Sequence, residues 1–169
     1  TIIAIALAAI LMFIFPLMTM SDRTDDVSQL TVDTATTEFV DDIRTTGKIT
    51  QDKYDQFLQT IGSTGNTYNV EMEVQHLDEN PGKKTTQANY TKIGENVYYS
   101  EYTTQVLEQL ESSTTGEISL KEGDRIVVNV KNTNTTQAQT LKGSLLSFTN
   151  AGQYTIAASS TGMIKVNGK

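Results

Sequence analysis

The sequence predicts an α+β protein: a long N-terminal helix, hydrophobic at first and then amphipathic, packed on an antiparallel β-sheet head. Three observations support this class. Residues 1–20 (TIIAIALAAILMFIFPLMTM) carry no charge and few polar side chains. An apolar stripe with helical spacing then continues to about residue 46. Beyond Gly47, several segments alternate apolar and polar residues, as half-buried strands do, and Gly, Asn and Asp separate them.

The first segment is long enough to cross a bilayer, because about 20 apolar residues in a helix match a hydrocarbon core of roughly 30 Å. In lipid it must be helical, since a helix satisfies its own backbone polar groups there. Four small side chains would allow close contact between helices: Ala4, Ala6, Ala8 and Ala9. Pro16 lacks an N–H, so we expect a kink or a short unwound patch at residues 12–16.

The helical pattern continues beyond residue 20. The apolar stripe comprises Val32, Ala35, Thr36, Phe39, Val40 and Ile43, with Val27 and Leu30 roughly along its extension. No Gly or Pro interrupts residues 21–46, and Gly47 is a natural stop. We therefore expect one helix of about 45 residues, roughly 70 Å long. The predicted organisation is a helix at 1–46 (membrane or filament segment 1–20, amphipathic part 21–46) and a globular α+β head at 47–169.

A short helix and a strand follow. Thr50 is placed to cap a helix with Asp52 in its first turn and an apolar face made of Tyr54, Phe57, Leu58 and Ile61. Residues 67–77 alternate and predict a half-buried strand whose inward side chains are Tyr68, Val70, Met72 and Val74. A turn at 78–82 would lead into a returning strand at 85–93, and a second turn would precede residues 97–99.

The remaining elements are short. The sequence predicts a helix at 103–110, an edge strand at 117–121 and a helix at 136–148 that Gly143 weakens. Residues 125–131 predict a strand with Ile126, Val128 and Val130 inward. Strands at 154–158 and 163–166, flanking residues 159–162, would form a C-terminal hairpin. The result would be an antiparallel sheet of about four to six strands.

Charge and composition exclude several classes of function. The chain has 169 residues, with 20 Asp and Glu against 13 Lys and Arg, and a net charge of −7. Nucleic acid is therefore not a predicted partner, because its phosphates require basic patches. The chain has no cysteine, which excludes disulfides and thiolate chemistry. No Lys/Arg cluster follows the apolar segment, which fits a head on the non-cytoplasmic side under the positive-inside rule.

Few residues are candidates for chemistry. His76 is the only histidine, and we expect a structural or surface role for it. Glu71 and Glu73 are paired carboxylates, but exposed Glu on alternate strand positions is the ordinary way to solvate a strand. Residues 78–80 lack the spacing of an EF-hand loop and predict a turn. We therefore expect no enzyme activity, no cofactor and no metal site.

Acidic residues follow the apolar segment. The simplest interpretation is that they are solvated on the helix surface: Asp22, Asp25, Asp26, Asp41 and Asp42. Alternatively, Asp22, Arg23 and Asp26 make polar contacts between neighbouring copies. Asn89 and Asn134 begin glycosylation acceptor patterns, which matter only in a host that glycosylates.

Three interpretations of residues 1–20 compete. A cleaved signal peptide needs a basic region and a small-residue cleavage site, but residues 1–10 contain no Lys or Arg and MTMSD is a poor site. A plain membrane anchor agrees with the composition. In the third interpretation a prepilin peptidase removes a short leader and exposes a hydrophobic helix that later forms a filament core. A start without Met and without a basic leader agrees with that expectation.

On these features the chain resembles the type IV pilin superfamily, with similarity to Tad-type or archaeal-type pilin-like subunits. The resemblance lies in the uncharged segment 1–20 with Pro16 inside it, the unbroken continuation to Thr46 and the β-rich head. The segment 38–74 is similar to pilin-like proteins of Gram-positive bacteria. Bacterial type IV pilins typically carry glutamate at the fifth mature position. Ile5 stands there if Thr1 is the mature start, so register between copies would come from apolar packing alone.

The resemblance implies a major pilin, the structural subunit of an extracellular type IV-like filament. Its partners would be other copies of itself, the cytoplasmic membrane before assembly, a prepilin peptidase and an assembly ATPase. The expected assembly core is Ile2, Ile3, Ile5, Leu7, Ile10, Leu11, Phe13, Ile14, Phe15, Pro16 and Leu17. The alternative is a single-pass membrane-anchored surface protein whose β-rich domain binds a ligand or a partner.

Overall fold

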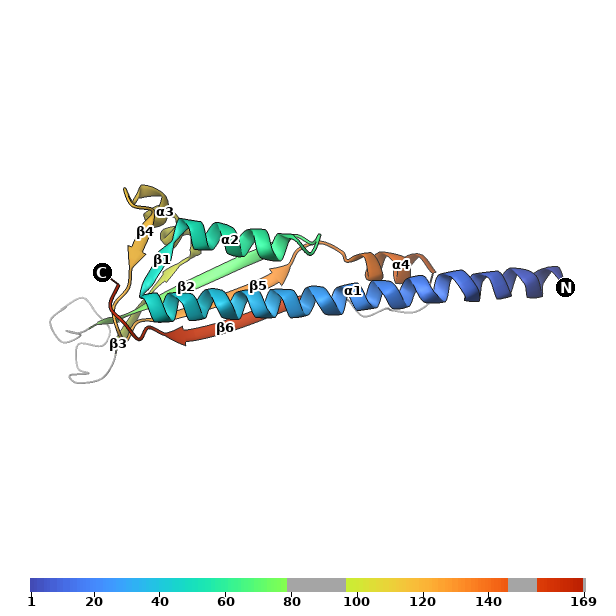
Figure 1. Cartoon of the computed structure of the whole chain (residues 1–169), viewed down its shortest axis with the longest axis horizontal. Helices are drawn as coiled ribbons and strands as arrows, with labels where there is room; N and C mark the ends of the chain where they lie inside the picture. The colour runs from blue at the N-terminus through green and yellow to red at the C-terminus, as the bar shows by residue number, and fades with distance from the viewer. Residues whose placement is uncertain (79–96, 146–154, 169) are drawn as a thin grey trace.

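The protein is a long rod with a head around one end, and the computed structural model describes residues 1–78, 97–145 and 155–168 (Figure 1). The helices are α1 (Ile2–Thr46), α2 (Gln51–Gly62), α3 (Thr103–Ser112) and α4 (Gln137–Leu145). The strands are β1 (Lys48–Thr50), β2 (Tyr68–Asp78), β3 (Val97–Tyr102), β4 (Glu117–Ser119), β5 (Arg125–Asn132) and β6 (Ala157–Met163). The predicted α+β class is confirmed.

Helix α1 is continuous over 45 residues, as predicted. It passes through Pro16 without a non-helical residue, so the predicted unwound patch is absent. Proline removes one backbone hydrogen bond, and the intact turns on either side keep the segment helical. The helix ends at Gly47, which has φ of 68° and donates its N–H to the Ile43 carbonyl oxygen at 2.8 Å.

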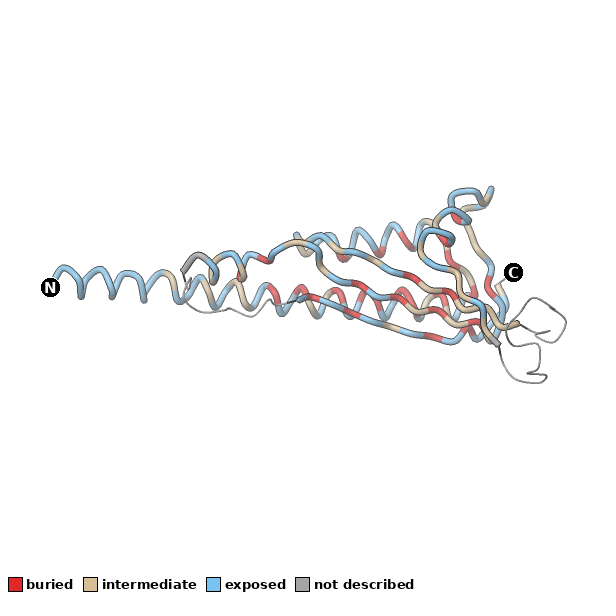
Figure 2. The backbone as a smooth tube through the Cα atoms, turned by 180° about the vertical axis from the view of Figure 1, so that it is seen from behind, coloured by how far each residue is buried: buried red, intermediate tan, exposed pale blue. Residues whose placement is uncertain are grey.

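The second half of α1 is buried on one face, as Figure 2 shows by colour. The predicted stripe is confirmed, because Val32, Ala35, Thr36, Phe39, Val40 and Ile43 are all buried. The predicted extension is wrong: Val27 and Leu30 are 58% and 67% exposed. Asp25 and Ser28 are buried instead, since they precede Val32 by seven and four residues and so share its helix face.

A four-stranded antiparallel sheet forms the head, in the order β3-β2-β5-β6. The predicted strands at 67–77 and 125–131 pair with each other, with Met72 opposite Val128 and Val74 opposite Ile126. The hairpin partner of β2 is β3, which pairs with residues 73–78. The predicted turn after Asp78 and the predicted strand at 85–93 lie outside the described residues. A separate two-stranded sheet joins β1 to β4, the expected edge strand.

The predicted C-terminal hairpin is wrong. Strand β6 continues across the expected turn at 159–162 and pairs with β5 along its length. Ser159 faces outward and donates its hydroxyl to Asn129 Oδ1 at 2.6 Å, while Gly162 is buried beneath the Arg44 side chain. The serines and glycine resemble a turn by composition, but the long open edge of β5 provides a partner that keeps them extended.

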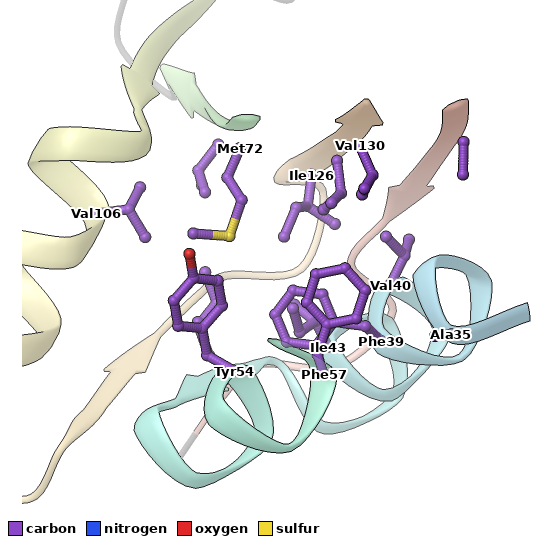
Figure 3. Packing of buried hydrophobic residues seen from close by; sticks show 14 of the residues in the cluster. Ala35, Phe39, Val40, Ile43, Tyr54, Phe57, Met72, Val106, Ile126 and Val130 are labelled. Carbon is purple, nitrogen blue, oxygen red and sulfur yellow. The ribbon is translucent and has the colours of Figure 1, made fainter. Parts of the chain in front are cut away.

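The helices α1 and α2 close the core over one face of the sheet (Figure 3). The Phe39 and Phe57 rings stack there with centroids 4.7 Å apart. Thr50 caps α2 as predicted, accepting the Lys53 N–H at 3.3 Å. Leu58 is 36% exposed, so the predicted apolar face of α2 is narrower by one residue. The predicted helices at 103–110 and 136–148 correspond to α3 and α4, and residues beyond 145 of the latter lie outside the described part.

We predict that Gly47→Ala destabilises the protein more than Gly65→Ala. Both glycines have positive φ (68° and 77°), which costs a residue with a Cβ about 1–2 kcal/mol. At Gly47 the Cβ would also collide with the backbone of Val166 and Gly168, whereas nothing lies within 4 Å of it at Gly65. Urea unfolding of the detergent-solubilised chain, followed by tyrosine near-UV circular dichroism, would measure both losses. Equal losses would contradict a close approach at Gly47.

Candidate assembly surface

The first half of α1 is uncovered. All but one of the predicted core residues are exposed, from 83% at Ile2 to 49% at Ile10 among the large hydrophobic ones, and Ile14 is half-buried. In the described part of the chain, α1 contains the one stretch long and apolar enough to cross a membrane, and none of that stretch is buried. Burial of apolar surface is favourable by about 25 cal/mol per Å². This half therefore requires lipid or protein around it.

Several hydroxyl groups along α1 donate to carbonyl oxygens one turn earlier in the same helix. Thr19 donates to the Phe15 carbonyl oxygen at 3.1 Å, and Thr24 donates to that of Met20 at 3.0 Å. Thr31 repeats the pattern two turns further on, with the Val27 carbonyl oxygen at 2.9 Å. A hydroxyl bonded to the preceding turn exposes its methyl group and hides its donor. The surface of α1 is therefore less polar than its threonine content suggests.

Helix α4 lies against α1 near the border between the apolar half and the head (Figure 1). The Thr136 hydroxyl, just before α4, donates to Asp25 Oδ2 at 2.6 Å. Further along α4, Lys142 Nζ lies 2.5 Å from Asp22 Oδ1. We call these two contacts the α4 collar. It is largely polar, since Ala138 is the one buried apolar residue among those whose burial is described in α4.

The contacts of the α4 collar correct the interpretation of Asp25 and give Asp22 a partner within the chain. Asp25 was expected to be solvated, but it is 5% exposed and hydrogen-bonded to Thr136. Asp22, a predicted contact between copies, has Lys142 as a partner in its own chain. The other two predicted contacts, Arg23 and Asp26, are exposed. Helical spacing back from Val32 would have identified Asp25, but its charge argued against burial.

The last two acidic residues of α1, Asp41 and Asp42, make ion pairs within the chain. Asp41 pairs with Arg44 one turn away, and Asp42 Oδ1 lies 3.8 Å from Lys53 Nζ on α2. Asp41 is exposed and Asp42 is half-buried. Exposed pairs of this kind contribute little to stability, about 0–1 kcal/mol. The first pair lies within α1, and the second links α1 to α2.

His76 has the structural role that the sequence predicts. Its Nδ1 lies 3.0 Å from Asp124 Oδ2, its Nε2 lies 3.5 Å from Glu101 Oε2, and its ring stacks on Tyr99. The buried Asp124 also accepts the Leu77 N–H at 2.9 Å. These contacts tie the ends of β2, β3 and β5 together. Among the residues that the structure describes, no group of His, Asp or Glu is arranged to hold a metal ion.

The paired glutamates of β2 differ from each other. Glu71 is exposed and accepts the Asn69 side-chain amide at 3.0 Å. Glu73 is half-buried and accepts hydrogen bonds from Gln75 and Ser100, which hold its pKa below the ordinary value. A carboxyl group with a lowered pKa is a poor general acid or base near neutral pH.

Both polar atoms of the Asn134 side chain, which begins the one glycosylation acceptor pattern that the structure describes, are hydrogen-bonded. Its amide donates to Asn66 Oδ1 at 2.9 Å, and its Oδ1 accepts the Thr67 N–H at 3.0 Å. These bonds hold the start of β2 beside the end of β5. The other acceptor pattern, at Asn89, lies outside the described residues.

Comparison with protein-family models, curated proteins and solved structures finds no match for this chain. A functional proposal therefore depends on the geometry of the uncovered half of α1 and of the head that holds it.

We predict that Asp25→Ala releases α4 from α1 without unfolding the sheet. The substitution leaves the Thr136 hydroxyl without its acceptor, and a hydrogen bond to a charged group contributes about 1.5–3 kcal/mol. Hydrogen exchange of the amides at 137–145 should become about tenfold faster or more, while exchange in β5 stays unchanged. The control is Asp26→Ala, an exposed neighbour. Unchanged exchange in α4, or equal acceleration in both variants, would contradict the collar.

Proposed function

We propose that this chain is a major pilin, the structural subunit of an extracellular type IV-like filament that assembles through the first halves of α1. The observation that supports the proposal is the division of one continuous helix. Its second half is part of the core of the head, and its first half has no cover within the described chain. Because the second half of α1 is packed into the head, the continuous helix holds its apolar half in a fixed direction.

The apolar half suits two successive environments. Residues 2–20 measure about 28 Å as a helix, close to the roughly 30 Å hydrocarbon core of a bilayer. In a filament the same surface would pack against copies of itself, and the alanines Ala4, Ala6, Ala8 and Ala9 would allow close approach. No ion would be buried in either state, because the segment carries no charge.

The head suits the outer wall of such a fibre. The chain's net charge of −7 lies entirely outside residues 1–20, so the acidic groups would face water. Before assembly, the subunit would be held in the cytoplasmic membrane with the head outside. A prepilin peptidase and an assembly ATPase are the partners that this proposal requires.

A single-pass membrane-anchored surface protein is the second candidate. The observation that favours it is the length and composition of α1, which suit an anchor equally well. Electron microscopy of material sheared from cells that produce the protein separates the two. Fibres that contain the chain support the pilin, whereas chain found solely as membrane-bound monomers supports the anchor.

We predict that Leu7→Asp abolishes filaments and leaves the head folded. Leu7 is 54% exposed and touches no part of the head core, but a carboxylate there would have to be buried among neighbouring helices. Immunoblotting of the sheared fraction measures assembly, and near-UV circular dichroism of the purified chain measures folding. Thr161→Asp, on the exposed face of β6, is the matched control and should assemble normally. Normal fibres from Leu7→Asp would contradict packing through this segment.

A further inference from the structure

A groove lies on the face of the sheet opposite the core. Met72 and Val74 of β2 are buried in the core, so Glu71 and Glu73 lie on the other face, because successive side chains of a strand alternate. The groove has a volume of about 350 Å³, within the roughly 300–1,000 Å³ of small-molecule sites. The polar and aromatic residues that line it include Glu71, Glu73, Tyr102, Thr104 and Asn129.

Three neighbouring strands bring these side chains together. Asn129 of β5 is directly opposite Glu71, and Tyr102 of β3 is directly opposite Glu73. The Cβ atoms of such cross-strand pairs are about 4.5–5.5 Å apart. Tyr102 is 59% exposed and lines the groove at the point where β3 ends and α3 begins. One small ligand can therefore contact all four side chains.

Neighbouring side chains hold the polar groups of the groove in place. Glu71 Oε1 accepts the Asn69 amide at 3.0 Å, and Glu73 Oε1 accepts two hydrogen bonds of its own. Asn129 Oδ1 accepts the Ser159 hydroxyl at 2.6 Å, so its Nδ2 group remains to donate. A carboxylate has about four acceptor positions, so both glutamates can accept further hydrogen bonds. The groove thus has oriented acceptors and an oriented donor before any ligand binds.

This combination of groups suits a neutral sugar. Sugar hydroxyls both donate and accept, so they match the carboxylate acceptors and the Asn129 amide donor at the same time. The C–H face of a pyranose ring matches the exposed ring of Tyr102, whose body is apolar. An organic cation would leave the Asn129 amide without an acceptor, and an anion would meet two carboxylates.

We propose that the groove binds one neutral pyranose unit of a carbohydrate. The groove belongs to a single head, so this inference stands or falls independently of filament assembly. If the heads form the outer wall of a filament, every subunit carries one such site.

Nuclear magnetic resonance titration of the full chain tests the site. The ¹⁵N-labelled chain is kept in a detergent without a sugar headgroup, since such a headgroup would compete. The methyl glycosides of glucose, galactose and mannose are added in turn. At least one should bind with millimolar affinity and give saturable amide shifts at residues 71–73, 102–104 and 129.

Shifts that are absent, that do not saturate or that lie elsewhere on the head would overturn the sugar site and leave the proposed function intact. Methylguanidinium chloride and calcium chloride are the competing probes. Saturation at the same residues by either of them, with no response to the glycosides, would also overturn it.

Four variants locate the bound sugar in the groove. Glu71→Ala and Tyr102→Ala should each weaken binding of the responsive glycoside about tenfold or more, since the first removes a charged acceptor and the second removes the ring. Tyr102→Phe keeps the ring and should bind as the natural chain does. Glu111→Ala, an exposed carboxylate on α3, is the matched control for Glu71→Ala.

The same spectra show whether each variant is folded. Equal affinities of Glu71→Ala and Glu111→Ala, or of Tyr102→Ala and Tyr102→Phe, would overturn the inference.

Discussion

The packing of the second half of α1 against the sheet is the interaction on which the rest of the structure depends. Val32, Val40 and Ile43 are almost fully buried there, beside the stacked rings of Phe39 and Phe57. Because α1 runs unbroken through Pro16, this packing also fixes the direction of the apolar half outside the head. A flexible joint near residue 20 would leave that half free to fold back. Because the helix is continuous, the apolar half projects from the head in one fixed direction.

Polar contacts concentrate at the border between the two halves. Asp25 is buried against the Thr136 hydroxyl, and Asp22 pairs with Lys142, so α4 is attached to α1 by hydrogen bonds and charge rather than by apolar packing. Polar contacts in partly dry surroundings specify one arrangement more than they add stability. On the other side of the same helix, Val27 and Leu30 stay uncovered. At this border, one face of α1 is covered by the chain's own residues and the opposite face is exposed.

Much of the fold could be predicted from the sequence, because its strongest patterns are local. The buried stripe of α1 and the alternation of β2 and β5 follow from periods of 3.6 and 2. The sequence did not predict the burial of Asp25, since that depends on Thr136, far away along the chain. It did not predict that β6 continues through residues 159–162, because the open edge of β5 overrides a turn-like composition. The candidate assembly surface at residues 2–17 was predicted, because a long uncharged segment is visible in the sequence alone.

The most direct test of the account is a helical reconstruction by electron cryo-microscopy of filaments purified from cells that produce the chain. The account predicts that the apolar halves of α1, residues 2–20, form a bundle along the axis, and that the acidic heads form the outer wall. A filament held together by heads alone, with residues 2–20 at its outer surface, would contradict the account.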